Sequence, residues 1–169
     1  MKRKITFVLV LALAAFFVMG SASAGLFDFL GGGGDAVENQ TYDFNECTLD
    51  IPSDATVVNK TVNEQGVLLE TFVITYANGT PMLLETLSGG NIVPTIDDYK
   101  MNAAYLGAKY LEDHGKWAVF NTTNADLGDD SSQEYVDYVL AYHDGTHIYQ
   151  IEGNDLDLLK SVADTFKAK

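Results

Sequence analysis

Two histidines four residues apart, His143 and His147, are the first residues whose types and spacing suggest chemistry. Such a pair can bind one metal ion when both lie on a helix, where side chains four positions apart share a face. Here Asp144 and Gly145 lie between them and predict a two-residue β-hairpin turn. Because side chains alternate between the faces of a sheet, we expect the histidines on opposite sides, with no shared metal ion.

An acidic stretch late in the chain offers oxygen ligands of the kind that Ca²⁺ prefers. Its candidate ligands are Asp126, Asp129, Asp130 and Glu134. The EF-hand pattern fails, because Gly128 stands where a ligand is needed. We expect a solvated loop, and the alternatives are weak Ca²⁺ binding or the carboxylates of a secreted hydrolase.

Cys47 is the only cysteine, so no disulfide can form within the chain. It alternates with Leu49 and Ile51, a pattern that favours a buried, inert thiol over a nucleophile or an interchain bridge. His114, beside Gly115, is expected at the C-terminal end of a helix, where it complements the helix dipole.

Known catalytic motifs are missing from the sequence. It contains no G-x-S-x-G, no H-E-x-x-H, no C-x-x-C and no glycine-rich phosphate loop before a lysine. Paired carboxylates leave no fixed spacing, so they are not excluded. We expect a protein that is not an enzyme and that carries no cofactor.

Residues 1–24 have the pattern of a secretory signal peptide. Basic residues at positions 2–4 precede an apolar run over residues 5–19, and Ala22 and Ala24 form an A-x-A cleavage site. The alternative is an uncleaved membrane anchor, lengthened by the apolar residues that follow. We expect an extracellular or cell-surface protein.

Residues 25–40 join this leader to the expected domain. Four apolar side chains near their start are candidates for interaction with a partner, the membrane face or the domain itself: Leu26, Phe27, Phe29 and Leu30. A disordered N-terminus is the other interpretation. The four glycines at 31–34 predict a flexible tether, because ordering glycine is entropically unfavourable.

Removal of the leader makes the chain more acidic. The whole chain has 10 Lys+Arg and 24 Asp+Glu, and the leader holds three of the bases and none of the acids, which leaves seven against 24. Arg3 is the only arginine, so the mature chain lacks the planar guanidinium that grips phosphates. Nucleic acid is therefore not expected as a partner, and the membrane only through an uncleaved leader or the apolar stub.

Four Asn-x-Thr sequons predict N-glycosylation, at Asn39, Asn59, Asn78 and Asn121. The alternative is a surface rich in Asn and Thr that matches the pattern by accident. Pro81 follows the third sequon and is expected to lower its use.

The remaining residues, 41–169, predict one α+β domain. Expected strands cover "TYDF" with "CTLDI", "TVVNKTV", "VLLETFVITYA", "TPMLLETLS" and "KWAVFNTT", and Asn78-Gly79 and Asp144-Gly145 predict hairpins. The second hairpin would place its tyrosines on one core face, with sugar stacking as the alternative: Tyr138, Tyr142 and Tyr149.

Two amphipathic helices complete the expectation. The first begins at a Thr95 cap and continues through Tyr110 to Gly115, and the second begins at an Asn154 cap. The element order is β-β-β-β-α-β-β-β-α, with about six to seven mostly antiparallel strands and both helices packed on the sheet.

This order, with the strand that ends in Ile51 and Pro52 near its start, resembles the Mog1/PsbP-like α+β sandwich. The leader, the acidity, the sequons and the "GLFDFL" stub resemble uncharacterised cell-envelope proteins of methanogenic archaea. Neither resemblance carries over a functional residue. The sequence thus favours a non-catalytic extracytoplasmic binding domain; the alternatives are a secreted carboxylate-dependent hydrolase and a weakly Ca²⁺-dependent adhesive domain.

Overall fold

The computed structural model describes residues 37–64, 67–89, 95–105, 108–122 and 137–169. The predictions on the leader, the apolar stub, the four glycines and the acidic loop that holds the Ca²⁺ candidates lie outside these residues. The described elements are β1 (Asn39–Asp43), β2 (Cys47–Pro52), β3 (Thr56–Asn59), β4 (Val62–Glu64), β5 (Val67–Thr75), β6 (Pro81–Ser88), α2 (Ile96–Tyr105), β7 (Lys109–His114), β8 (Trp117–Asn121), β9 (Tyr138–His143), β10 (Ile148–Gly153), α3 (Leu156–Ala163) and β11 (Lys167–Ala168).

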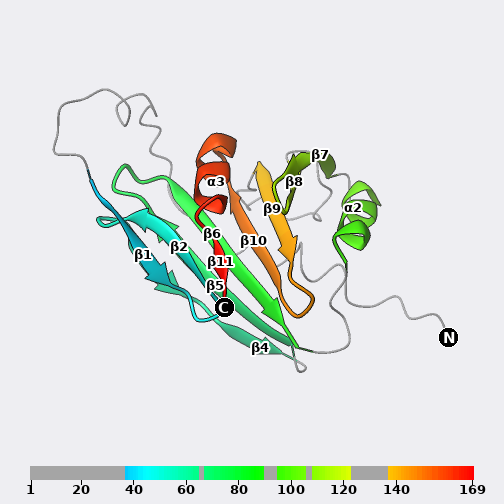
Figure 1. Ribbon diagram of the computed structural model, residues 1–169, viewed down its shortest axis with the longest axis horizontal. Helices are drawn as coiled ribbons and strands as arrows, with labels where there is room; N and C mark the ends of the chain where they lie inside the picture. The colour runs from blue at the N-terminus through cyan, green and yellow to red at the C-terminus, as the bar shows by residue number, and fades with distance from the viewer. Residues whose placement is uncertain (1–36, 65–66, 90–94, 106–107, 123–136) are drawn as a thin grey trace, which may run out of the picture.

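The fold is α+β and its strands are antiparallel, as the sequence predicts. A large sheet has the order β3-β5-β6-β10-β9-β8-β7, and β4 also pairs with β5. A small sheet has the order β1-β2-β11. Figure 1 shows the small sheet and α3 in front of the large sheet, with α2 at the side of β7. Among the described residues, no helix is long and apolar enough to span a membrane.

The main core lies between the large sheet and the layer formed by α3 and the small sheet. Leu49 and Ile51 of β2 and Leu159 of α3 pack there against Leu84 of β6 and Leu140 of β9, and all five side chains are at most 1% exposed. Alternation along the strands puts these residues on one face because the side-chain period is two. Burial of this apolar surface is the main driving force for the fold.

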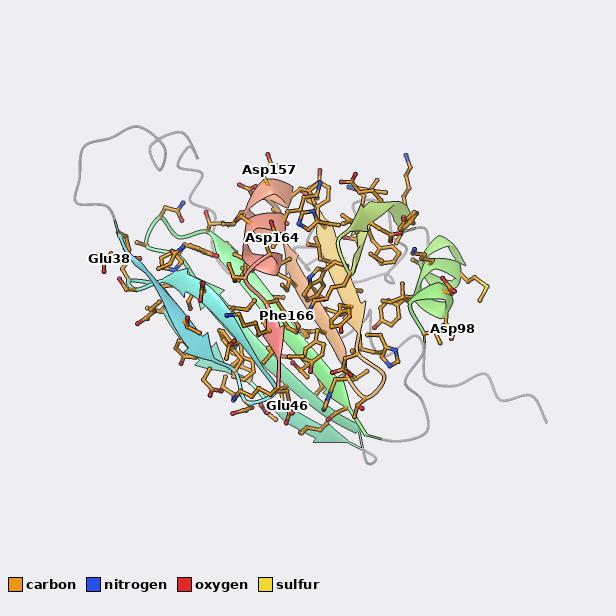
Figure 2. All side chains as sticks on the ribbon, viewed as in Figure 1. Glu38, Glu46, Asp98, Asp157, Asp164 and Phe166 are labelled. Atoms are coloured by element: carbon orange, nitrogen blue, oxygen red, sulfur yellow. The ribbon has the colours of Figure 1, made fainter. Side chains whose placement is uncertain are left out.

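The tyrosines of the second hairpin belong to this core, as predicted. Tyr149 is fully buried and its ring stacks on Tyr142 with centroids 5.9 Å apart. Phe166 lies edge-on to Tyr149 at 4.8 Å and to Trp117 at 5.0 Å. Figure 2 labels Phe166 just below α3. These rings therefore pack between the two sheets. They do not form the exposed tyrosine surface that the sugar-stacking alternative requires.

A smaller core lies on the opposite face of the large sheet, under α2. Tyr99 and Ala103 of α2 pack there with Ala118, Phe120 and Ala141. Most of these side chains are small, so α2 buries little apolar area compared with α3 and its neighbours. We infer that α2 is held less strongly than α3.

Both predicted hairpins are present. Gly79 has φ +84° in the β5–β6 turn and Gly145 has φ +103° in the β9–β10 turn, the left-handed region that glycine tolerates best. The second loop is longer than predicted: Ile148 pairs with His143, so residues 144–147 form the connection. The residue opposite each position of β9 therefore lies two positions later in the sequence than predicted. Because two is an even number, each side chain stays on the face of the sheet that was predicted for it.

The first helix is shorter than the sequence predicts. α2 ends at Tyr105, and residues 109–114 form the edge strand β7, in which Tyr110 pairs with Phe120. Gly115, with φ +59°, lies in the β7–β8 turn and does not end a helix. The predicted place of His114 at the end of the first helix is therefore wrong: its Nε2 lies 2.8 Å from Oδ1 of Asp164, the C-cap of α3.

Other element boundaries also differ from the prediction. The predicted opening strand is a hairpin of β1 and β2, turned at Asn45 with φ +62°. β1 begins at Asn39, so two residues assigned to the tether belong to the sheet. The stretch "TVVNKTV" is divided between β3 and β4, both paired with β5.

The C-terminal helix has a different cap from the one predicted. Asp155 is the N-cap of α3, and its Oδ1 accepts from the N–H of Leu158 at 3.0 Å. Asn154 instead accepts from the N–H of Asp137 at 2.9 Å. Beyond Phe166, the strand β11 pairs with β2, which the sequence pattern did not predict.

Candidate functional site

The most unusual feature of the fold is a row of polar side chains on the face of the large sheet that also carries α2. Thr71 of β5 lies opposite Glu85 of β6, and Glu85 lies opposite Gln150 of β10. Glu152 follows two residues later on the same face of β10 because strand side chains alternate. The cross-strand register of the sheet therefore places these polar side chains next to one another.

These side chains and Tyr99 of α2 form one hydrogen-bonded cluster, which we call the carboxylate cluster: Thr71, Glu85, Tyr99, Gln150 and Glu152. Tyr99 OH donates to Gln150 Oε1 at 2.6 Å. Gln150 Nε2 donates to Glu152 Oε1 at 2.8 Å and to Glu85 Oε2 at 3.3 Å. Thr71 Oγ1 donates to Glu85 Oε1 at 3.2 Å. One amide group thus links two carboxyl groups.

Burial of the carboxylate cluster is almost complete. Glu85 is 2% exposed and Glu152 is 1% exposed. In the described part of the chain, no ion pair involves either of them, and Glu152 Oε2 has no hydrogen-bond partner. An isolated charge in such surroundings is strongly unfavourable, so protonation of a carboxylate is the expected response.

Burial raises the pKa of Glu85 to about 7, although hydrogen bonds from Thr71 and Gln150 oppose the change. Burial, and then the charge of Glu85, raises the pKa of Glu152 well above its usual range. Burial also raises the pKa of Tyr99, so its phenol stays protonated as a donor. At neutral pH the pair therefore retains at least one proton. Carboxyl groups with pKa values shifted toward 7 can donate and accept protons, which is a feature of functional sites.

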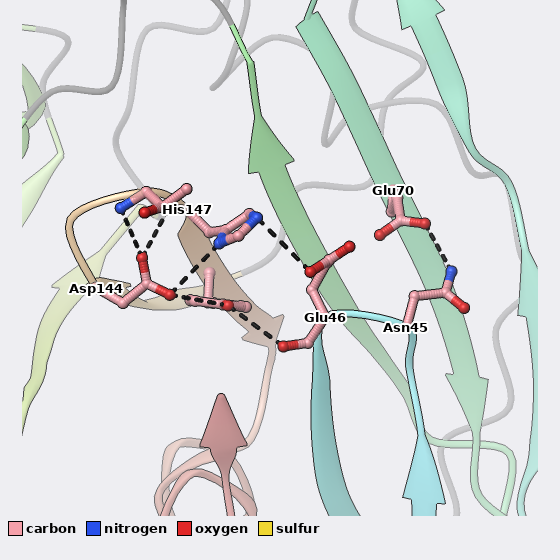
Figure 3. A network of polar contacts seen from close by, with 7 residues as sticks. Asn45, Glu46, Glu70, Asp144 and His147 are labelled. Carbon is pink, nitrogen blue, oxygen red and sulfur yellow. Dashed lines mark hydrogen bonds and ion pairs between the residues drawn. The ribbon is translucent and has the colours of Figure 1, made fainter. Parts of the chain in front are cut away.

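A second polar cluster surrounds the β9–β10 turn (Figure 3). Asp144 Oδ1 accepts from the N–H groups of Thr146 and His147, each at 2.7 Å, and Asp144 Oδ2 accepts from Tyr149 OH at 3.1 Å. His147 lies between two carboxylates: Nδ1 is 3.4 Å from Asp144 Oδ2 and Nε2 is 3.7 Å from Glu46 Oε2. The contacts join this turn to the β1–β2 turn.

Electrostatics in the second cluster favour a structural role. Burial alone would raise the pKa of Asp144, but the N–H groups of His147 and Thr146 and the Tyr149 hydroxyl outweigh burial and lower it. Burial and then the hydrogen bond to Asp144 raise the pKa of Tyr149. A carboxylate that accepts backbone donors stabilises its turn. The cluster therefore holds the two turns together.

The histidines and the cysteine of the sequence analysis do not form a joint site. His143 is half-buried on β9, while His147 lies in the turn after it. Among the described residues, no group of three or more His, Cys, Asp or Glu side chains could hold a metal ion. Cys47 is fully buried, and burial raises the pKa of its thiol to about 12. The prediction that this thiol is buried is confirmed, and its low reactivity stays a prediction.

The sequence analysis missed the carboxylate cluster. Its only signal was polar residues inside strongly apolar strands, "PMLLETLS" and "IYQIEG". In a strand with one solvent face, Glu85 and Glu152 would point outward. Here both faces of the sheet are covered, and they point into the second layer of the core.

Comparisons of the chain with protein-family models, with curated proteins and with solved structures find no match. Both resemblances noted from the sequence therefore stay expectations. The arguments about function below depend on this chain's own residues.

Proposed function

We propose that the chain is a non-catalytic, extracytoplasmic binding domain that contacts another component of the cell envelope. One observation carries the proposal: an exposed apolar corner on two neighbouring elements, α2 and β7, which we call the α2–β7 corner. Its side chains are Met101, Tyr110 and Leu111, which are 66%, 36% and 37% exposed. Exposed apolar side chains on two elements that pack together offer a place for an interaction site.

The two elements of this corner are tied to each other. Lys100 of α2 lies with its Nζ 4.5 Å from the ring centroid of Tyr110, and the same Nζ lies 3.0 Å from Asp113 Oδ1. α2 and β7 are also side by side in Figure 1. The corner is therefore a preformed surface, which lowers the entropic cost of binding.

Charge around the corner indicates the chemistry of a partner. The same two elements carry four carboxylates, Asp97, Asp98, Glu112 and Asp113, and only two lysines, Lys100 and Lys109. Figure 2 shows labelled carboxylates spread around the whole molecule, from Glu38 to Asp98. A partner that places basic residues around an apolar contact fits this surface best.

Retention in envelope fractions tests the proposal. One variant changes Met101 and Leu111 to Ser, and a second changes Leu26, Phe27, Phe29 and Leu30 to Ser. We expect release of the protein from washed envelopes in at least one variant. Val58→Ser is the matched control, because Val58 is an apolar side chain, 51% exposed, on β3. Unchanged retention of both multiple variants would contradict the proposal.

A second candidate function is hydrolysis with paired carboxylates. The observation in its favour is the carboxylate cluster. Glu85, with a pKa of about 7, and Glu152 both accept hydrogen bonds from the side-chain amide of Gln150. Because both carboxyl groups are buried, the fold would have to open locally for a substrate to reach them. A hydrolytic activity that Glu85→Gln and Glu152→Gln both abolish, while folding is retained, would establish this function in place of the first.

A further inference from the structure

The four sequons differ in local geometry, and this difference bears on which asparagine can be modified. Attachment of a glycan requires the carboxamide nitrogen, Nδ2, to act as a nucleophile. That nitrogen is normally unreactive because its lone pair is delocalised into the carbonyl. A hydroxyl that donates to the carboxamide oxygen stabilises the form in which Nδ2 has lost a proton.

The reaction itself is a group transfer. The Nδ2 of asparagine forms a bond to the anomeric carbon of a sugar, and the bond from that carbon to a lipid-linked phosphate breaks. The phosphate leaves with the electron pair, and the Nδ2 proton passes to a base of the transferase. The acceptor must also be exposed, so that the transferase can reach its carboxamide.

Asn59 meets these requirements. It is exposed and is the last residue of β3, where it pairs with Phe72 of β5. Its Oδ1 accepts both from the N–H of Thr61 at 2.9 Å and from Thr61 Oγ1 at 2.5 Å. The hydroxyl of its own sequon is thus already placed on the carboxamide oxygen.

Asn78 meets the same requirements only in part. It is exposed in the β5–β6 turn, and its Oδ1 accepts from the N–H of Thr80 at 2.9 Å. Pro81 opens β6 directly after the sequon and fixes the backbone there. We therefore expect less glycan at Asn78 than at Asn59.

The other two sequons have unsuitable geometry. Asn39, the first residue of β1, is exposed, but the hydroxyl of Thr41 donates its one proton to Asp50 Oδ1 at 2.6 Å, so this proton does not reach the carboxamide of Asn39. Asn121 is half-buried in β8, between its partners Lys109 and Tyr138.

We propose that Asn59 is the principal site of N-linked glycan attachment, that Asn78 is modified less, and that Asn39 and Asn121 remain unmodified. The glycan donor is a lipid-phosphate-linked oligosaccharide. This inference depends on the extracytoplasmic location in the proposed function. β3 and β7 lie at opposite ends of the large sheet, so a glycan at Asn59 shields one end and leaves the α2–β7 corner open.

Peptide mass spectrometry of the native protein tests the inference, together with the identity of its N-terminal residue. We expect a processed N-terminus and an oligosaccharide mass on the peptide that contains Asn59. A processed N-terminus without glycan at Asn59 would overturn the inference and leave the location intact. An intact Met1 without glycan would overturn both. Greater occupancy at Asn39 than at Asn59 would show that sequons are modified without regard to this geometry, and would also overturn the inference.

Variants of the hydroxyl test whether the attached glycan depends on the sequon of Asn59. Thr61→Val keeps the size of the side chain but removes the donor and with it the sequon, and we expect at least a tenfold loss of occupancy at Asn59. Thr61→Ser keeps the donor and should keep most of the occupancy. Thr41→Val is the control: it destroys the sequon at Asn39 and should leave the mass of the attached glycan unchanged.

Discussion

Replacement of Glu85 with glutamine should change how the stability of the protein depends on pH. The pKa of Glu85 is raised from 4.5 to about 7 in the folded chain. A raised carboxyl pKa means that the folded state binds the proton more tightly than the unfolded state. The stability from this group is therefore fully present below pH 4.5 and is lost as the pH rises through 7.

The size of the effect follows from the shift. One pKa unit corresponds to about 1.4 kcal/mol, so Glu85 alone should account for a loss of roughly 3 kcal/mol in the free energy of unfolding between pH 4.5 and pH 8. Glu152, whose pKa is also raised, adds a loss of its own that begins at the same pH. Glutamine cannot ionise. The free energy of unfolding of Glu85→Gln should therefore fall by roughly 3 kcal/mol less than that of the wild type between pH 4.5 and pH 8.

Urea denaturation at pH 5, 6, 7 and 8 measures this difference. The wild type should be least stable at pH 8, and Glu85→Gln should be more stable than the wild type there. Glu38→Gln makes the same chemical change at an exposed position and should leave the pH dependence as in the wild type. If the free energies of unfolding of Glu85→Gln and the wild type changed in parallel with pH, the raised pKa of Glu85 would be refuted. The argument that burial disfavours its charged form would be refuted with it.

Three further outcomes are expected. Leu159→Ala, at a side chain 1% exposed in the main core, should lower the free energy of unfolding in urea by about 2–5 kcal/mol, and a loss under ~1 kcal/mol would contradict the assigned packing. The thiol of Cys47, with a pKa of about 12, should react with a maleimide only as fast as the protein unfolds, so rapid labelling of the native protein would disprove its burial. Asp164→Asn, which breaks the exposed contact with His114, should change the stability by less than ~1 kcal/mol, and a larger loss would give that contact an unexpected structural role.

The hairpins and the main core could be predicted from the sequence because their signals are local. Gly79 and Gly145 mark turns that need positive φ, and the alternation around Cys47 and Tyr149 places those side chains inside. Such patterns fix which face of a strand is buried without knowledge of the remaining fold.

The boundary between α2 and β7 could not be predicted in the same way. Tyr99, Ala103 and Tyr110 recur at helical spacing, so the local pattern continues the helix. In the structure Tyr110 pairs with Phe120 in an antiparallel ladder. Strand pairing with a distant segment overrides the local periodicity, and no property of residues 106–114 alone reports that pairing.

The carboxylate cluster was unpredictable for a related reason. Glu85 and Glu152 alternate with apolar residues, which normally indicates a strand with one side in water. Only the packing of Tyr99 from α2 over Gln150 shows that this side is covered. The candidate site thus arises from the contact of two elements whose own sequences do not reveal it.

The pairing of β11 has a consequence for the edges of the small sheet. β11 pairs with β2, and the N–H of Lys169 donates to the carbonyl of Glu46 at 3.0 Å. Two segments far apart in the sequence therefore meet in one ladder, and β2 is covered on both sides only when β11 is in place. Removal of residues 167–169 should therefore leave β2 with an unpaired edge that is prone to self-association.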